Sequence, residues 1–318
     1  MPPRPVIVRL RNWVGDAILG VPALKLLQQH GHEPQLVGKG WAPALLAGEG
    51  WPVHVRPAKL TERVAQLREL KRAATQADPQ FNRRDNALVL PTSFSGALEM
   101  RLAGLRAVGY AQEARGLLLS RAEPITYGGH ALTSYWELAC RFLRLDPQTA
   151  PPPRIALATR AEDQAAADAL LAQHGIDGDF IVICPFAGGQ FEKQEKTWPA
   201  FADFTRALLA RGRTVVACPG PGEDAIISEQ HAGTRSLPGV KLGVYGALLR
   251  RAALVISNDT GPAHLAAAVD TPVLSVLGPT KPEQWAPWGP QVTVVRRWPE
   301  WPTVDEVMAH VDAIRAAR

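Results

Sequence analysis

The sequence has few cysteines and no long apolar run. Cys140, Cys184 and Cys218 lie far apart in apolar surroundings without a C-x-x-C spacing, which argues against disulfides and against a zinc site. No apolar run reaches the roughly 18 residues of a membrane-spanning helix, and the N-terminal residues lack the pattern of a signal peptide. We therefore expect a cytoplasmic protein whose cysteines are small buried side chains.

Motifs of two further protein classes are also missing. No Gly-Lys-Ser/Thr triplet occurs, which argues against a P-loop, and no basic motif interleaved with aromatic residues indicates RNA binding. The net charge is a modest +5, but residues 51–121 hold twelve Lys or Arg against six Asp or Glu. This segment indicates either an anionic partner for the N-terminal half or arginines on solvated helix faces.

Short β-branched runs alternate with helical patterns along the chain. A length of 318 residues favours two domains, because single hydrophobic cores rarely grow beyond about 250–300 residues. Helical patterns occupy 17–31, 158–175 and 199–212. The expected strands are residues 5–10, 34–39, 86–91, 179–185, 213–219, 252–257 and 272–278. This alternation predicts two doubly wound α/β units with parallel sheets.

A proline-rich segment marks the boundary between the two domains. Residues 145–159 contain four prolines, and such segments act as semi-rigid spacers. The boundary is placed near Ala150, which gives an N-terminal domain over 1–150 and a C-terminal domain over 151–318. The final segment, 303–318, has helical periodicity and is a candidate to pack back across this boundary. Two such domains facing each other predict a cleft lined by the carboxyl ends of both sheets.

The first turn that could carry chemistry follows the first expected strand. Gly15 permits a tight turn there, and Asp16 lies where a helix begins. The simplest interpretation of Asp16 is a helix N-cap. The alternative is a general base, because a carboxylate at the tip of a βα turn would face the cleft.

The segment SNDTGPAHLAAA combines several signals of a helix start. Asp259 or Thr260 can cap the helix, and Pro262 suits its first position, where the missing N–H costs nothing. Gly261 lets a ligand approach the backbone, and the free N–H groups and helix dipole predict an anion site suited to a pyrophosphate. His264 lies in the first turn with its side chain directed toward that anion. The alternative is a capped helix with a satisfied histidine.

Two more turns in the second domain are candidate ligand sites. A glycine-containing loop carries Lys193 and Lys196. We expect Lys193 to be exposed to solvent, whereas Lys196 could neutralise the charge of a bound phosphate. The turn PGPGEDA at 219–225 fits G-x-G-x-x-A and leaves a nicotinamide-cofactor interpretation open. That turn follows the second strand of its domain, whereas the dinucleotide fingerprint belongs after the first. Glu223 or Asp224 could instead hydrogen-bond a ribose, or cap a surface helix.

Four longer motifs, at 11–24, 90–119, 196–199 and 257–289, cover parts of both domains. The last and most specific reads SNDTGPAHLAAAVDTPVLSVLGPTKPEQWAPWG, and the third is Lys-Thr-Trp-Pro. Together they resemble glycosyltransferase family nine, the lipopolysaccharide heptosyltransferases. The motif at 90–119 is similar to the ADP-heptose:lipopolysaccharide heptosyltransferase II branch.

This resemblance implies a GT-B fold, with a nucleotide-sugar donor at the C-terminal domain and an acceptor lipid at the N-terminal domain. It also implies metal-independent, inverting transfer of heptose from ADP-heptose to the lipopolysaccharide inner core, without a cofactor. Asp16 matches the family's general base, and the ribose-binding acid falls at or near Glu223. The other donor-binding positions that match the family are Lys196, Asp259, Thr260, Gly261 and His264.

The implied acceptor is anionic and lipid-linked, so the protein would visit the cytoplasmic face of the inner membrane. Its basic N-terminal surface is the candidate contact. Three alternatives remain open: a family relative using another nucleotide sugar or acceptor glycan, a nicotinamide-dependent oxidoreductase, and a non-catalytic nucleotide-sugar binder. The oxidoreductase would use the turn at 219–225, whereas the binder would hold ADP-heptose without turnover.

Overall fold

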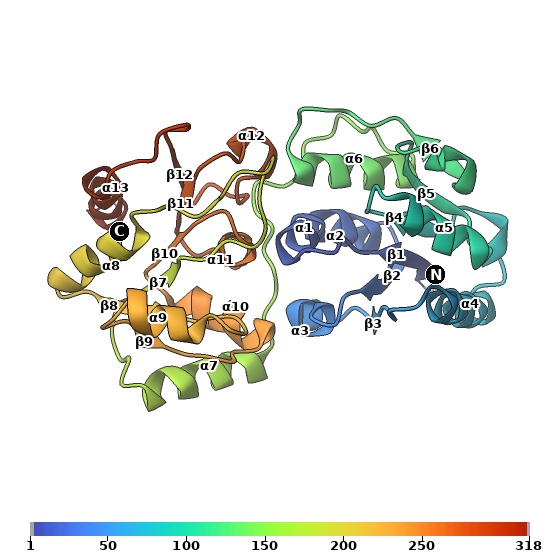
Figure 1. Cartoon of the computed structure of the whole chain (residues 1–318). Coiled ribbons are helices and arrows are strands. Elements are labelled where there is room, and N and C mark those ends of the chain that lie inside the picture. The colour runs from blue at the N-terminus through green and yellow to red at the C-terminus, as the bar shows by residue number, and fades with distance from the viewer. Residues whose placement is uncertain (1–2, 317–318) are drawn as a thin grey trace. The chain divides into compact units, whose positions relative to one another are not determined.

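The computed structural model describes residues 3–316. The chain divides into two compact units, residues 1–152 and residues 153–318, which we call unit 1 and unit 2. Each unit contains one six-stranded sheet surrounded by helices (Figure 1). Within the described residues, no helix is long and apolar enough to cross a membrane.

Unit 1 is built on a sheet in the order β3-β2-β1-β4-β5-β6, with every neighbouring pair parallel. Its strands are β1 (Arg4–Arg9), β2 (His32–Gly38), β3 (Val53–Val55), β4 (Ala87–Val89), β5 (Ala107–Tyr110) and β6 (Arg121–Glu123). The direction of this order reverses between β1 and β4. Ligands of open parallel sheets usually bind beyond the carboxyl ends of the strands at such a point.

The helices of unit 1 pack in two groups against this sheet. They are α1 (Val14–Leu19), α2 (Val21–Gln29), α3 (Ala42–Leu46), α4 (Leu60–Ala77), α5 (Phe94–Leu102) and α6 (Ala131–Leu143). α4 contacts α5, whereas α1 and α2 contact α6. Ile7 and Val89 point from their strands into a core with Leu67 of α4 and Met100 of α5. This follows from the alternation of strand side chains between the two faces.

Unit 2 has a second parallel sheet, in the order β12-β11-β10-β7-β8-β9. Its strands are β7 (Phe180–Cys184), β8 (Thr214–Ala217), β9 (Arg235–Ser236), β10 (Leu254–Ser257), β11 (Val273–Leu277) and β12 (Val292–Arg296). Counted from the first strand of each unit, both sheets have the same order, 3-2-1-4-5-6. The reversal in unit 2 lies between β7 and β10.

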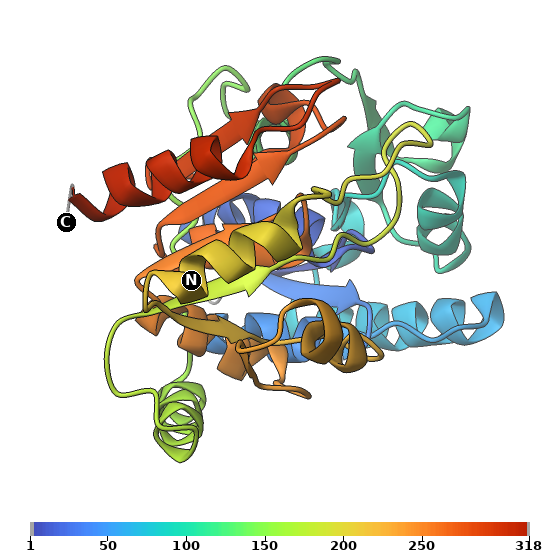
Figure 2. The same cartoon turned by 60° about the vertical axis from the view of Figure 1, so that its left-hand side comes forward.

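The helices of unit 2 are α7 (Ala161–Gln173), α8 (Phe201–Ala210), α9 (Asp224–Gln230), α10 (Leu242–Arg251), α11 (Gly261–Ala268), α12 (Pro282–Trp285) and α13 (Val304–Ala316). α8 and α13 contact each other over the sheet (Figure 2), whereas α10 contacts α7 and α11. Ile183, Ile256 and Val276 join Phe204 of α8 and Val311 of α13 in one buried core. Helix α13 therefore packs on α8 within its own unit.

The two doubly wound parallel sheets predicted from the sequence are confirmed. All seven expected strands are present, as β1, β2, β4, β7, β8, β10 and β11. Five strands were not predicted, and four of these, β3, β6, β9 and β12, are sheet edges. Edge strands are often short and partly polar, which removes the apolar run that marks a central strand.

One predicted helix is wrong in its extent. The helical pattern over 17–31 is in fact two helices, because α1 begins at Val14 and the chain breaks at Gly20 before α2. Pro22 lies in the first turn of α2, where its missing N–H does not disturb the helix. This break shortens the helix that carries Asp16 to six residues.

Candidate active site

A cavity of about 350 Å³ lies in unit 2 at the carboxyl ends of β7, β8 and β10, beside the reversal of the strand order. Its volume is in the range of small-molecule sites, and much of its wall is apolar. The apolar lining includes Ile183, Phe186, Ala217, Val240, Leu242 and Tyr245. Such walls suit the faces of an aromatic ring.

Glu223 carries the one formal charge among the described residues that line this cavity. Burial raises the pKa of the Cys184 thiol to about 11 and that of Tyr245 well above its usual range, so both keep their protons at neutral pH. The Oε2 atom of Glu223 accepts a hydrogen bond from the Gly220 N–H at 2.7 Å. Glu223 precedes α9 but its side chain does not cap that helix.

A polar cluster of Lys196, Asp259 and Thr280 joins three loops of unit 2, and we call it the unit 2 polar cluster. The Oδ2 atom of Asp259 accepts hydrogen bonds from Lys196 Nζ at 3.2 Å and from Thr280 Oγ1 at 2.7 Å. Lys196 Nζ also donates to the Asp259 carbonyl oxygen at 3.2 Å. The Lys196 and Asp259 side chains are 14% and 13% exposed, so the ammonium group is held at a fixed, partly desolvated position.

The Lys-Thr-Trp-Pro segment is anchored so that its lysine reaches this cluster. The Trp198 backbone N–H donates to Asn258 Oδ1 at 3.0 Å, and the Trp198 indole N–H donates to the Pro302 carbonyl at 3.0 Å. Asn258 also donates from Nδ2 to the Pro185 carbonyl at 2.5 Å. Trp198 and Asn258 are both buried, so the loop after β7 is tied to the end of β10. Lys193, in contrast, is exposed, as the sequence predicts.

Helix α11 begins beside the same cavity. Thr260, which lines the cavity, occupies the N-cap position with an extended backbone, but neither it nor Asp259 caps the helix through its side chain. Gly261 is the first helical residue, so Pro262 stands one position later than the sequence predicts. His264 is buried in the first turn. The N–H groups at a helix start have no partner within the helix, which leaves them available to an anion.

In unit 1, Asp16 lies in the first turn of α1. The N-cap position is Trp13, so the interpretation of Asp16 as an N-cap is wrong. The Oδ1 atom of Asp16 accepts hydrogen bonds from the Tyr135 hydroxyl at 2.8 Å and from Arg11 Nε at 3.4 Å. Within residues 3–316, Oδ2 of Asp16 has no hydrogen-bond or ion-pair partner. One carboxylate oxygen is therefore held by the protein and the other is available to a substrate.

Tyr135 comes from α6, which contacts α1. Burial, reinforced by the negative charge of Asp16, raises the pKa of Tyr135 well above its usual range. The hydroxyl therefore keeps its proton and acts as a donor to Asp16. The guanidinium carbon of Arg11 lies 5.9 Å from the centroid of the Tyr135 ring, a distance typical of a cation–π contact.

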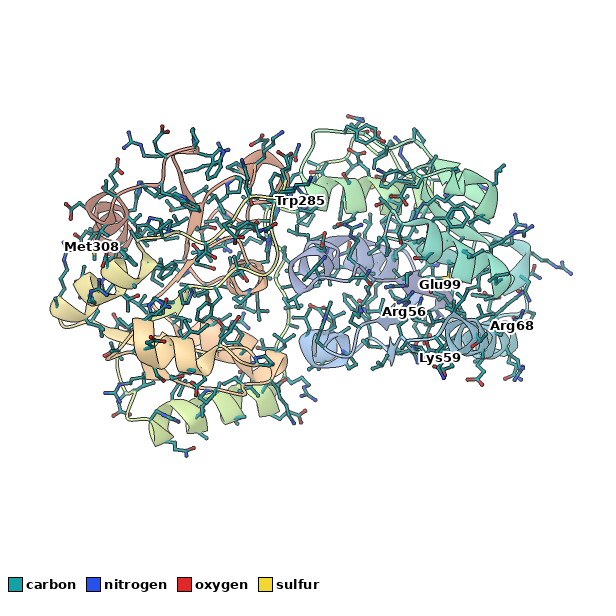
Figure 3. All side chains as sticks on the ribbon, viewed as in Figure 1. Arg56, Lys59, Arg68, Glu99, Trp285 and Met308 are labelled. Carbon is teal, nitrogen blue, oxygen red and sulfur yellow. The ribbon has the colours of Figure 1, made fainter. Side chains whose placement is uncertain are left out.

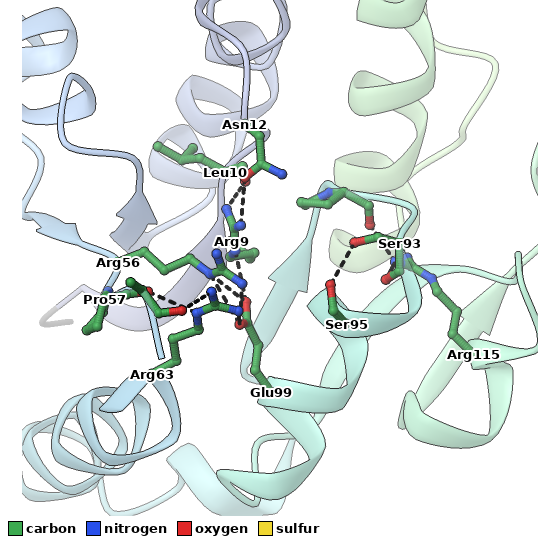
Figure 4. A network of polar contacts seen from close by, with 12 residues as sticks. Arg9, Leu10, Asn12, Arg56, Pro57, Arg63, Ser93, Ser95, Glu99 and Arg115 are labelled. Atoms are coloured by element: carbon green, nitrogen blue, oxygen red, sulfur yellow. Dashed lines mark hydrogen bonds and ion pairs between the residues drawn. The ribbon is translucent and has the colours of Figure 1, made fainter. Parts of the chain in front are cut away.

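Three arginines surround one buried carboxylate at the carboxyl edge of the unit 1 sheet (Figure 4). Glu99 of α5 is 1% exposed and accepts hydrogen bonds from Arg9 Nε at 2.9 Å and from Arg56 Nη2 at 2.8 Å. Arg63 Nη1 lies 3.8 Å from the same carboxylate. Burial and the nearby charge of Arg56 lower the pKa of Arg9 to about 10, so Arg9 stays charged at neutral pH.

This cluster accounts for part of the basic segment noted in the sequence. Arg56 and Glu99 lie close together inside unit 1, whereas Lys59 is 79% exposed (Figure 3). The cluster holds three positive charges against one negative charge, so it keeps a surplus of positive charge at this edge. The basic segment thus contains both exposed basic residues and arginines gathered around a buried carboxylate, and an anionic partner stays a prediction.

Arg115 supports the turn after β4 from below (Figure 4). It is fully buried and donates from Nη1 to the carbonyls of Pro91, at 2.5 Å, and Ser93, at 3.1 Å. Its Nε donates to the Tyr110 carbonyl at 2.8 Å. Burial lowers the pKa of Arg115 to about 10, which leaves it charged at neutral pH. This side chain fixes the start of α5, the helix that carries Glu99.

The structure thus brings most of the predicted donor residues into one region of unit 2. Glu223 and Thr260 line one cavity, Lys196 binds Asp259, and Gly261 and His264 belong to the helix that starts there. Asp16 lies in unit 1. Three residues were missed as site residues, Thr280, Asn258 and Tyr135. The first two lie inside the motif at 257–289, whereas nothing in the sequence links Tyr135 to Asp16.

Candidate metal ligands are sparse. Within residues 3–316 there is no group of three or more His, Cys, Asp or Glu side chains arranged to hold a metal ion. Asp177 and Asp179 have a D-x-D spacing, but they precede β7 and therefore lie at the amino end of that strand. The cavity lies at the other end of the same strand.

Comparison with known proteins identifies the family. The model of glycosyltransferase family 9 (heptosyltransferase) matches residues 80–311, well over half of the chain. The chain belongs to this family. This protein is thus a glycosyltransferase. For the turn at 219–225, this favours a role in a transferase over binding of a nicotinamide cofactor.

Individual relatives of this protein are named lipopolysaccharide heptosyltransferases. Lipopolysaccharide heptosyltransferase 2 of Salmonella typhimurium strain LT2 is 26% identical over 309 residues, which cover 90% of this chain and 86% of the relative. Lipopolysaccharide heptosyltransferase 3 of Escherichia coli is 37% identical over 124 residues, about a third of either chain (36% and 35%).

A solved structure of the same kind shows the fold. The structure described as E. coli ADP-heptose lps heptosyltransferase II has a TM-score of 0.78 and 22% sequence identity, covering 99% of this chain and 98% of that one. The family 9 chain therefore has the two-domain α/β fold of the GT-B type, as the sequence resemblance implied.

Proposed function

We propose that this protein transfers heptose from ADP-heptose to the inner core of lipopolysaccharide, by an inverting and metal-independent reaction with Asp16 as the general base. Family membership supports the reaction type, and the names of the relatives support the donor and the acceptor. The observation that carries the proposal is the meeting of the unit 2 polar cluster and the start of α11 beside one apolar cavity.

The donor would be held entirely by unit 2. The apolar cavity would take the adenine ring, and Glu223 would bind the ribose hydroxyls through the carboxylate oxygen that Gly220 does not occupy. Lys196 and the N–H groups at Thr260 and Gly261 would face the pyrophosphate. His264 and Asp259 complete the wall on the side of the sugar.

The chemical step would use both units. Asp16 accepts the proton of the acceptor hydroxyl, the hydroxyl oxygen forms a bond to the anomeric carbon of heptose, and the bond from that carbon to the phosphate oxygen breaks. ADP leaves with the electron pair, and its growing negative charge is stabilised by Lys196 and the start of α11. The new bond forms on the face opposite the leaving group, which inverts the configuration.

The acceptor would bind unit 1. Its acidic groups would meet the surplus positive charge of Arg56 and Arg63, and the ring of Trp13, which is 66% exposed three residues before Asp16, offers a sugar an apolar face. Because this acceptor is linked to a lipid, the protein would act at the cytoplasmic face of the inner membrane through transient contact with its surface.

The first test is donor binding by calorimetry. ADP, ADP-heptose, UDP-glucose and NAD are titrated into the wild type, Lys196→Ala and Lys193→Ala. We expect selective binding of ADP and ADP-heptose that weakens about tenfold or more in Lys196→Ala and is unchanged in the exposed control Lys193→Ala. Preference for UDP-glucose would remove heptose from the proposal, and preference for NAD would overturn the donor class.

The second test addresses the base. Asp16→Asn should keep the donor affinity of the wild type while its transfer rate falls by about two orders of magnitude or more, the scale of lost general-base catalysis. Because the donor would be held by unit 2, amide hydrogen exchange of β1 serves as the control for the folding of unit 1. Equal transfer rates in wild type and variant would refute the role of Asp16.

A further inference from the structure

The carboxylate of Asp16 is held asymmetrically. Both of its protein hydrogen bonds, from the Tyr135 hydroxyl at 2.8 Å and from Arg11 Nε at 3.4 Å, end on the same oxygen, Oδ1. Within residues 3–316, Oδ2 has no such partner. A carboxylate fixed through one oxygen cannot rotate freely, so the other oxygen keeps one direction.

Tyr135 is a buried residue whose hydroxyl donates to Asp16. It is 5% exposed and comes from α6, 119 positions away in the chain, so the hydrogen bond joins two separate helices. Its hydroxyl also interacts with the guanidinium group of Arg11, which contacts the same oxygen of Asp16. A buried hydroxyl is usually satisfied, and here the carboxylate of Asp16 is what satisfies it.

One arginine contacts Asp16, and a second arginine lies near the first. Arg11 belongs to the turn after β1, and its guanidinium group also lies over the Tyr135 ring. Arg115 lies in the turn after β5. Burial, and to a smaller extent the charge of Arg11, lowers the pKa of Arg115 to about 10, so Arg115 stays charged between pH 5 and about 9. Neither arginine changes its charge in the range where a carboxylate titrates.

From this geometry we infer that Tyr135 is a positioning residue for the reaction: it holds Oδ1 of Asp16 so that Oδ2 receives the proton of the acceptor hydroxyl. The inference rests on the proposed role of Asp16 as the base. It adds that the acceptor hydroxyl approaches Oδ2, and that Arg11 assists Tyr135 from the same side. Correct placement of a catalytic group within fractions of an ångström accounts for large factors in rate.

The test removes the hydroxyl in Tyr135→Phe and measures the pH profile of transfer together with kcat and KM. A carboxylate that loses a hydrogen bond to its charged form takes up a proton at higher pH, so the acid limb of the pH profile should move upward. We expect kcat to fall about tenfold with little change in the KM for the donor. Arg11→Gln, at a partly exposed side chain, should move the acid limb in the same direction by less.

A matched control separates positioning from simple stabilisation of α6. The hydroxyl of Tyr110 is also buried and donates to the Ser134 carbonyl of α6 at 2.5 Å, next to Tyr135 in the chain. Tyr110→Phe should therefore lower stability to a similar degree and leave the pH profile unchanged. If both variants behave alike, or if Tyr135→Phe leaves the acid limb in place, the inference is overturned.

A readout independent of activity distinguishes this failure from failure of the proposed function. The carboxyl carbon of Asp16 is followed by NMR through a pH titration in wild type and Tyr135→Phe. If the titration midpoint of Asp16 moves upward in Tyr135→Phe while activity is unchanged, the hydrogen bond between Tyr135 and Asp16 exists but has no part in catalysis. An unmoved midpoint would refute the contact itself, whatever Asp16→Asn does to the rate.

Discussion

Replacement of Glu99 by Gln should strongly destabilise unit 1. The exchange keeps the size of the side chain but removes the one negative charge that faces Arg9, Arg56 and Arg63, and it turns an NH₂ group toward a guanidinium group. Arg9 is 2% exposed and Glu99 is 1% exposed, so water cannot replace the lost charge. Removing one partner of a buried ion pair costs about 3–5 kcal/mol, and we expect the free energy of unfolding of unit 1 to fall by that amount.

Amide hydrogen exchange of the β1 backbone is the suitable measurement, because it reports on unit 1 without contribution from unit 2. A loss of about 3–5 kcal/mol corresponds to exchange about a hundredfold to several thousandfold faster in the most protected amides. The control is Glu62→Gln, the same chemical change at a side chain that is 51% exposed and lies 3.7 Å from Lys59. Exposed pairs contribute about 0–1 kcal/mol, so the control should exchange almost like the wild type.

The comparison between these two variants tests whether the Glu99 carboxylate holds the three arginines together. If Glu99→Gln and Glu62→Gln change the exchange of β1 equally little, the Glu99 carboxylate does not hold the arginines together. The cluster would then be a set of independently solvated charges. Refuting the prediction in this way would also remove the reason for a fixed cationic group at this edge of the sheet.

Three further predictions concern unit 2 and the reaction. Thr280→Val removes a donor to the unit 2 polar cluster and should weaken ADP binding about three- to tenfold by calorimetry. The control is Thr234→Val, whose hydroxyl has no hydrogen-bond partner among residues 3–316, and ADP binding should be unchanged in that variant. Gly278→Ala would place a methyl group inside the Trp301 ring and should lower stability by about 1–3 kcal/mol in thermal unfolding; Gly188→Ala, with open space around it, is the control. Transfer activity should persist in EDTA, and a loss restored by magnesium would contradict the metal-independent mechanism.

The central strands could be predicted because burial on both faces leaves a continuous apolar run in the sequence. The runs that form β7, β10 and β11 are of this kind, with every residue buried. The edge strand β9 has only two residues, one of them exposed, so its pairing depends on the neighbouring strand. The break at Gly20 has a local signal instead, because Pro22 lacks the N–H that would bond the Ile18 carbonyl and continue α1.

Local motifs predicted which residues of unit 2 lie close together better than they predicted the surroundings of Asp16. Lys196 and Asp259 each stand in a recognisable turn, and their contact follows from adjacent parallel strands. The contact between Tyr135 and Asp16 depends on how α6 packs against α1, and no local pattern encodes that packing. The grouping of three arginines around Glu99 could not be predicted from the sequence either, because the arginines come from separate segments of the chain.

The shared strand order of the two sheets has a consequence for how such proteins can diversify. The cavity, the unit 2 polar cluster and the start of α11 are all contributed by residues after the boundary at 152. Substitutions at these positions lie outside the core of unit 1, which is closed by its own helices. Recombination at the proline-rich linker would therefore exchange one unit together with its complete core.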